Sequence, residues 1–420
     1  MKKKFFILNI LGLLTIFVKY SLTITLTRAI GLEAFGYYQK ILNYGNLVGI
    51  IIAGGMGLFA VQVYSKNAIS NLNLEMQIVN IYTITMGLFS IFIFIVVGLF
   101  PSILTNSIFI CVAVGSTYAL NNVVTRSLQG KRYQILSDLL RDTLIPIALI
   151  ITLSIGLEDV TSYVILRCLF LSVAAYIGLT FITFDLKSLM HLRYGKFFKE
   201  LRSVYREYVK ILSSNISLNL LRLLSSKIDL LLAPFLLEPI EYGAYAYIRI
   251  IFTILGLPYT VVNKLYIPEV KLLKSGLKSS ELTQKFIKLN SVTFVFQVLL
   301  GIFLFCSFTS INSFFGISID YNYSFSIFLI IAYLTETWFG QNIALLTFTN
   351  NRKLAIRGTV LSLLVGALML FTLGVYFGMI GIALSVLLGN LTKNVILEKS
   401  CLDTLKYSPA INFRSWKLTK

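Results

Sequence analysis

Residues 6–30 read FILNILGLLTIFVKYSLTITLTRAI and follow the cationic start Lys2-Lys3-Lys4. A secretory signal has an apolar core of about 7–15 residues and then a small-residue cleavage site. The run here is longer than such a core, and no Ala-x-Ala site follows it. Since about 20 mostly apolar residues cross a bilayer, we expect 6–30 to form the first transmembrane helix.

The whole chain has a similar character. Of its 420 residues, 57% are hydrophobic and 13% are charged, with a mean hydropathy of +0.82. Soluble globular chains carry about 25% charged residues, so a soluble enzyme is excluded. The aromatic content of 14% excludes disordered and fibrous classes. The composition therefore predicts an all-α polytopic membrane protein.

About twelve apolar segments have the length of a membrane span. They are roughly 6–30, 38–64, 76–100, 104–128, 134–156, 160–184, 208–235, 243–268, 287–310, 323–348, 355–377 and 379–399. With the N-terminus inside, most Lys and Arg residues fall in cytoplasmic connections, whereas the opposite loops carry mainly carboxylates. This alternation predicts two cytoplasmic termini and explains the net charge of +19 without a nucleic-acid partner.

A basic loop at about 185–206 divides these spans into two sets of six. We expect an N-terminal six-helix bundle with its connecting loop at 1–207, a C-terminal bundle at 208–400 and a cytoplasmic tail at 401–420. Because six is even, a pseudo-two-fold axis along the membrane normal can relate the bundles. The sequence Phe35-Gly36-Tyr37-Tyr38 recurs, 207 residues later, as Tyr242-Gly243-Ala244-Tyr245.

Several cations fall inside the predicted spans. Each costs about 2.5–3.5 kcal/mol at the centre of a span, and it survives by pairing, by snorkelling or by lining a wet cavity. Three of them lie near outer span ends, where snorkelling is possible: Arg28, Lys40 and Arg249. The others are Lys19, Arg141, Arg167, Arg222 and Lys227.

The seventh span carries a polar stripe. At 100° per residue, its members stay close to a single line along the helix. They are Asn215, Asn219, Arg222, Ser226 and Asp229, and Lys227 lies just off this line. The stripe predicts either a cavity wall or a buried polar seam between two helices.

The carboxylates within the spans have two interpretations. In the fifth span, Asp138, Arg141 and Asp142 nearly cancel in charge, which favours an internal salt bridge. Glu336, in the tenth span, could be a proton or cation site or the partner of a buried cation. Asp229 could pair with Lys227 or Arg222. Cations outnumber carboxylates overall, and this balance suits an anionic passenger such as a phosphate or an acidic sugar.

Motifs for other chemistry are missing. Four scattered cysteines and a single histidine offer neither metal-ligand spacing nor a catalytic triad. The chain has no Walker-type phosphate loop. We therefore expect no cofactor, no metal and no catalytic residue.

Four stretches occur in a characteristic order: Arg28 to Tyr38, Lys227-Ile228-Asp229-Leu230-Leu231-Leu232, Tyr242 to Tyr245, and Gly378-Met379-Ile380-Gly381-Ile382-Ala383. In this layout the chain resembles the Wzx-type polysaccharide-unit flippases of the multidrug/oligosaccharidyl-lipid/polysaccharide exporter (MOP) superfamily. The resemblance implies two six-helix bundles forming a V around a cationic cavity in a bacterial inner membrane. It also implies that Lys19, Arg28, Arg222 and Lys227 line this cavity, where Asn215 and Asn219 join them from the stripe.

The leading hypothesis is a flippase that moves undecaprenyl-diphosphate-linked oligosaccharide to the outer leaflet by alternating access. It would serve O-antigen (lipopolysaccharide) or capsule synthesis, with a polymerase and other assembly proteins as partners. Glu336 or Asp229 could couple transport to H⁺ or Na⁺. One alternative is a multidrug efflux antiporter, which predicts a cavity dominated by carboxylates. Another is a polytopic glycosyltransferase or polymerase, which predicts a large outer loop.

Overall fold

Helices make up all the regular structure that the computed structural model describes. The described residues are 2–65, 72–99, 107–131, 133–153, 160–182, 194–260, 262, 279–317, 323–348, 351–405 and 408–411. The chain divides into two compact units, Met1–Leu223 and Leu224–Lys420. The division falls inside helix α9 (Tyr194–Leu232), which also contains the boundary expected at residue 207.

The N-terminal unit is built on one central helix, α4. Its elements are α1 (Lys2–Ala53), α2 (Met56–Ser65), α3 (Leu72–Leu99), α4 (Ser107–Gly130), α5 (Gln134–Asp138), the π-helical turn η2 (Leu139–Thr143), α6 (Leu144–Leu153), α7 (Val160–Ile182) and the first part of α9. Gly31, with φ 80° and ψ 168°, separates α1 into two helical segments. Glycine adopts this backbone conformation without strain, so the predicted first span ends here.

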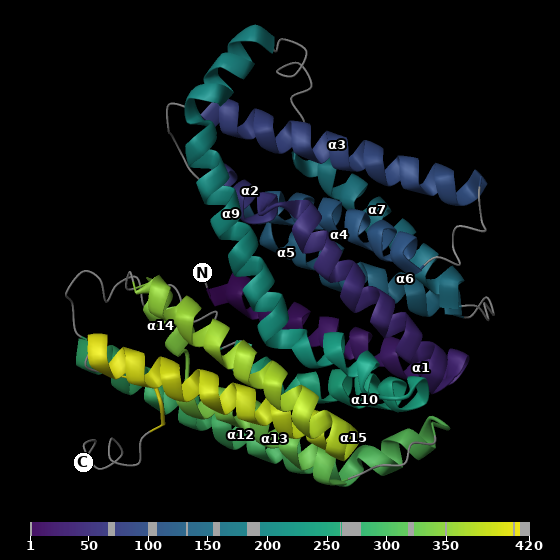
Figure 1. Cartoon of the computed structure of the whole chain (residues 1–420), viewed down its shortest axis with the longest axis vertical. Coiled ribbons are helices and arrows are strands. Elements are labelled where there is room, and N and C mark those ends of the chain that lie inside the picture. Colours follow the sequence, from purple (N-terminus) through teal and green to yellow (C-terminus); the bar gives the residue numbers. More distant parts are fainter. Residues whose placement is uncertain are drawn as a thin grey trace. The chain divides into compact units, whose positions relative to one another are not determined.

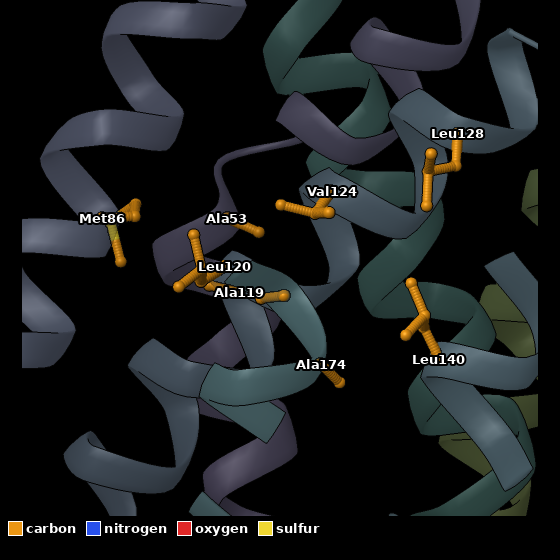
Figure 2. Packing of buried hydrophobic residues seen from close by; sticks show 9 residues of the cluster. Ala53, Met86, Ala119, Leu120, Val124, Leu128, Leu140 and Ala174 are labelled. Carbon is orange, nitrogen blue, oxygen red and sulfur yellow. The ribbon is translucent and has the colours of Figure 1, made fainter. Parts of the chain in front are cut away.

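Helix α4 packs against α1, α2, α3 and α7. Figure 2 shows its side chains Ala119, Leu120 and Val124 among residues from the neighbouring helices, with Met86 of α3 and Ala174 of α7 close by. Ala119, Leu120 and Val124 have no exposed surface. The polar side chains that α4 also buries, among them Thr117, Thr125 and Ser127, donate to backbone carbonyls of the helix itself, so α4 forms the core of this unit without leaving these hydroxyl groups unbonded.

Glycines bring α1 and α4 into close contact. A Cβ added to Gly115 of α4 would lie 2.8 Å from Val48 Cγ1, and one added to Gly49 would lie 2.8 Å from the Gly115 carbonyl oxygen. Gly45 and Gly49 are four residues apart, the spacing of small residues that lets membrane helices approach closely. The pairing of α1 with α4 thus depends on the absence of side chains.

The C-terminal unit begins with the end of α9. It continues with η3 (Ala233–Phe235), α10 (Pro239–Phe252), η4 (Thr253–Gly256), α12 (Ser279–Phe314), α13 (Tyr323–Phe339), α14 (Asn342–Phe348) and α15 (Arg352–Leu405). Gly378, with φ 55° and ψ −133°, breaks α15 into two halves. The halves fold back on each other, because a Cβ on Gly389 would lie 3.4 Å from Gly366 Cα. Figure 1 shows them side by side, and α15 also packs along α13.

Six helices in the described ranges are long and apolar enough to cross a membrane. They are Glu75–Ile93, Ser107–Gly130, Val160–Phe181, Pro239–Thr260, Ile287–Phe314 and Lys353–Leu405. The last of these contains the Gly378 break, and at 1.5 Å per residue each of its halves is at least about 35 Å long. On α12, large apolar side chains lie 56–62% exposed at Val292, Val295, Phe296, Leu299, Ile302 and Phe303. Their spacing marks one helix face, as expected for contact with lipid tails.

Because α1 and α4 are in close contact, we expect a single methyl group added between them to lower the stability of the protein. Gly115→Ala should destabilise the protein by about 1–3 kcal/mol, because overpacking forces the two backbones apart. Gly366→Ala is the matched control, since its added Cβ would meet its nearest neighbour, Gly389 Cα, at an ordinary 3.8 Å. Melting in detergent, followed by gel filtration, would measure both variants. A Gly115→Ala protein that melts like the wild type would contradict the close packing.

Candidate functional site

A buried carboxylate organises the polar interior of the C-terminal unit. Asp229 of α9 has a side chain that is only 2% exposed, and its Oδ2 accepts a hydrogen bond from Arg249 Nε at 2.8 Å. The Tyr245 hydroxyl donates to the same oxygen at 2.6 Å. Arg249 also donates to the Tyr333 hydroxyl, and its guanidinium lies 5.2 Å from the centre of the Tyr333 ring. Three helices, α9, α10 and α13, are joined at this point.

The local sequence explains why these groups meet. Tyr245 and Arg249 are four residues apart on α10, so they lie on the same face of that helix. Residues 242–249 are all buried. An arginine stays charged in a protein, and a buried charge requires a partner of opposite sign. Asp229 supplies that charge, and the two tyrosine hydroxyls add one hydrogen bond to Asp229 and one to Arg249.

A second ion pair lies further along α13. Lys393 Nζ of α15 is 2.8 Å from Glu336 Oε1 and also donates to Asn390 Oδ1 at 3.2 Å. The Lys393 side chain is 7% exposed and the Glu336 side chain is 26% exposed. Because Tyr333 and Glu336 are three residues apart on α13, both pairs are attached to one helix. We call Asp229, Arg249, Glu336 and Lys393 the charge chain, and its formal charges cancel.

The N-terminal unit contains a related but different arrangement. Arg167 Nη1 of α7 donates to the Tyr38 hydroxyl of α1 at 3.0 Å. Tyr38 is 1% exposed, and Tyr245, 207 residues later in the repeated motif, is fully buried. In both units the last tyrosine of this motif belongs to a polar cluster that contains an arginine. The motif therefore marks corresponding interior positions.

The four predicted cavity cations divide between the units. Lys19, Arg28 and Arg222 belong to the N-terminal unit and Lys227 to the C-terminal unit. Arg28 and Arg222 are exposed, whereas Lys19 and Lys227 are half-buried and have contacts of their own. One turn before Lys19, Thr15 Oγ1 and Thr143 Oγ1 lie 2.7 Å apart. A cavity shared by the four cations stays a prediction.

The polar stripe of α9 passes through three different environments. Asn215 is buried, and its Cβ would lie 2.8 Å from a Cβ placed on Gly55. Asn219 is half-buried and Arg222 is exposed. Asp229, at the other end, is buried in the charge chain. The stripe thus contributes to the interior of both units, and its exposed part is centred on Arg222.

The charged group of the fifth span is described only in part. Asp138, at the end of α5, is half-buried, and η2 follows it directly. The side chains of Arg141 and Asp142 lie outside the described residues. The predicted salt bridge in this span therefore stays a prediction.

Two members of the charge chain are buried where the sequence did not indicate a partner. Arg249, near a span end where snorkelling is possible, is instead buried against Asp229, and Lys393, inside the last predicted span, is buried beside Glu336. The buried motif ending at Tyr245, four residues before Arg249, is the signal that could have identified the first. No neighbouring residue in the sequence indicates that Lys393 is paired, because its partner Glu336 lies 57 residues earlier. Within the described ranges, no group of three or more potential metal ligands is present.

Solved structures of known transporters support this fold, whereas comparisons of sequence found no match. Neither a protein-family model nor a curated sequence matches the chain. A multidrug resistance MATE transporter of the MOP superfamily, in its inward-facing conformation, is 14% identical, with a TM-score of 0.65 over 95% of this chain and 99% of that one. The lipid II flippase MurJ is 12% identical, with a TM-score of 0.65 over 95% of this chain and 87% of its own.

The chain has the fold of the MOP-superfamily transporters. This confirms the prediction of an all-α polytopic membrane protein, with about twelve membrane helices in two bundles as in the MATE transporters. A MOP superfamily transporter from Pyrococcus furiosus, described with reverse polarity of its binding pocket, is 13% identical with a TM-score of 0.51. That match covers 97% of each chain.

The two ion pairs predict unequal losses of stability. Asp229→Ala should cost about 3–5 kcal/mol, because Arg249 would remain buried without a counter-ion and cannot lose its proton. Arg249→Met should cost less, since a buried carboxyl group can take up a proton. Thermal melting of both single variants and of the double variant would measure the coupling.

Two results would show that Asp229 and Arg249 interact directly. The double variant should lose less stability than the two single losses added together. Glu336→Gln is the matched control, and we expect a smaller loss because the Glu336 side chain is 26% exposed. Simple additivity at Asp229 and Arg249 would contradict the pairing.

Proposed function

We propose that the chain is a membrane transporter, and not an enzyme, that flips an anionic lipid-linked oligosaccharide across the membrane by alternating access. The observation that carries the proposal is the fold, which matches a MATE transporter and the lipid II flippase MurJ over nearly the full length of this chain. In transporters built from repeats, substrates bind between the two halves near the middle of the membrane. The proposed passenger carries an undecaprenyl diphosphate.

The charge distribution supports an anionic passenger. Asp229 and Glu336 are each held by a cation in the charge chain. These two carboxylates are therefore neutralised and offer a cationic drug no net negative charge. Arg222 is exposed on α9 and has the charge and the planar donors that suit a phosphate.

Efflux of cationic drugs is the second candidate, because MATE transporters share the fold. Such an antiporter needs carboxylates that can exchange a drug for H⁺ or Na⁺. The charge chain argues against this role for Asp229 and Glu336. A transporter with the same fold is described with reverse polarity of its binding pocket, so the fold accommodates different substrate charges.

The proposal includes a location and partners. Both termini would lie in the cytoplasm of a bacterium, as the distribution of Lys and Arg predicts. A polymerase and other polysaccharide-assembly proteins would use the flipped unit for O-antigen or capsule. Any coupling to H⁺ or Na⁺ would require a group that the charge chain does not already neutralise.

Deletion of the gene in its host tests the proposed function directly. Surface polymer should be lost while complete lipid-linked repeat units accumulate on the inner leaflet, because synthesis continues but passage stops. Immunoblotting of the polymer and mass spectrometry of extracted lipid-linked intermediates would measure the two effects.

Other outcomes of the deletion would contradict the proposal in distinguishable ways. Single unpolymerised units at the surface would indicate a polymerase. Truncated repeat units would indicate a glycosyltransferase. Unchanged polysaccharide together with increased drug sensitivity would favour efflux.

Substitution of the proposed substrate cations gives a second test. Arg222→Ala and Lys19→Ala should each abolish complementation of the deletion, because the diphosphate or acidic sugar loses a charge-assisted contact. Arg222→Lys should retain part of the activity. Surface polymer in the complemented strain and the amount of protein in the membrane would be measured together.

The matched control for these variants is Lys353→Ala, because Lys353 is exposed near the start of α15 and serves no proposed role. It should complement fully. Normal surface polymer with both Arg222→Ala and Lys19→Ala would overturn the cationic cavity.

A further inference from the structure

The arginine of the N-terminal cluster differs from its counterpart in the C-terminal unit. Arg249 is enclosed by Asp229 and Tyr333. Arg167, in contrast, has no carboxylate partner among the residues that the structure describes, where its guanidinium bonds the Tyr38 hydroxyl. At the same tyrosine position, the C-terminal unit thus pairs its arginine with a carboxylate, whereas in the described part of the N-terminal unit the arginine bonds a hydroxyl group.

Among the described residues, the guanidinium of Arg167 has its hydrogen bond with Tyr38, through one of its nitrogens, Nη1. The side chain as a whole is half-buried. A guanidinium has five N–H donors in a planar fork, so Tyr38 fixes its orientation and leaves donors available.

The position of Arg167 along its helix supports a functional role. Arg167 is seven residues after the start of α7 at Val160, and Tyr38 is seven residues after the break at Gly31. At 1.5 Å per residue, each lies about 10 Å from that helix end. The charge pattern of the loops predicts that both ends face the outside. The arginine would then lie in the outer third of the membrane.

We propose that Arg167, oriented by Tyr38, is a phosphate-binding site in the outer part of the N-terminal unit. Among the residues that the structure describes, Arg167 has no carboxylate partner, so an anion would offset its charge at this depth, and its planar fork matches two oxygens of a phosphate. The phosphate belongs either to the diphosphate of the proposed passenger or to a bilayer phospholipid. The first source rests on the proposed function and would place Arg167 where the headgroup arrives on the outer side.

Native mass spectrometry of the purified full-length protein tests the site without requiring transport. The protein is titrated with undecaprenyl diphosphate, with phosphate-free undecaprenol and with phosphatidylglycerol. Arg167→Gln should weaken binding of undecaprenyl diphosphate by about ten-fold, the effect of one lost charge-assisted contact, and leave undecaprenol unchanged. Arg167→Lys should lose less, because an ammonium keeps the charge but not the fork.

Two further variants complete the test. Tyr38→Phe should reduce binding of undecaprenyl diphosphate by less than Arg167→Gln, since it removes the orienting hydroxyl and keeps the charge. Arg357→Gln removes an exposed cation from α15 and should bind all three lipids like the wild type. Melting in detergent checks that every variant is folded. If Arg167→Gln is unstable, Arg167→Lys keeps the positive charge and still tests the loss of the planar guanidinium.

The losses of binding measured for the three lipids distinguish the possible ligands of this site. If Arg167→Gln weakens phosphatidylglycerol binding alone, the phosphate site stands and its ligand is the bilayer. Equal losses for undecaprenol and undecaprenyl diphosphate, or no loss for either phosphate lipid, would overturn the site. Unchanged polysaccharide after gene deletion would overturn the proposed transport function but not phosphate binding at Arg167, so the two failures are distinguishable.

Discussion

The cost of burying charge in a membrane protein is the constraint on which the C-terminal unit depends. Arg249 cannot lose its charge, and a buried charge without a partner would destabilise the protein. Asp229 offsets that charge at 2.8 Å, and two tyrosine hydroxyls add a hydrogen bond to each member of the pair. Because the partners come from α9, α10 and α13, the pair also fixes how these helices pack.

In the N-terminal unit, close packing between helices is the main interaction described. Its central helix α4 has 14 of its 24 residues buried, and glycines allow α1 to approach it closely. Such contacts consist of van der Waals packing, which drives helix association in lipid where the hydrophobic effect is weak. Close contacts at glycines occur in both units, and the C-terminal unit adds the paired charges of the charge chain.

This contrast bears on how a transporter of this fold can select its substrate. Charges that neutralise each other stabilise a bundle but attract no passenger. Charges without an internal partner attract an ion of opposite sign, and among the described residues neither Arg167 nor the exposed Arg222 is paired with a carboxylate. The selectivity that we propose therefore follows from which arginines are paired, and a simple count of Lys and Arg does not reveal it.

The sequence by itself determined the membrane character, the helical spans and the breaks near Gly31 and Gly378, because hydropathy and glycine conformation are local properties. It also identified the repeated motif that ends in Tyr38 and Tyr245. Only the tertiary structure decided the pairing, since Asp229 meets Arg249 across 20 residues and Glu336 meets Lys393 across 57. The physical reason is that a buried ion pair forms between neighbouring helices in space, and spacing along a single helix does not specify its neighbour.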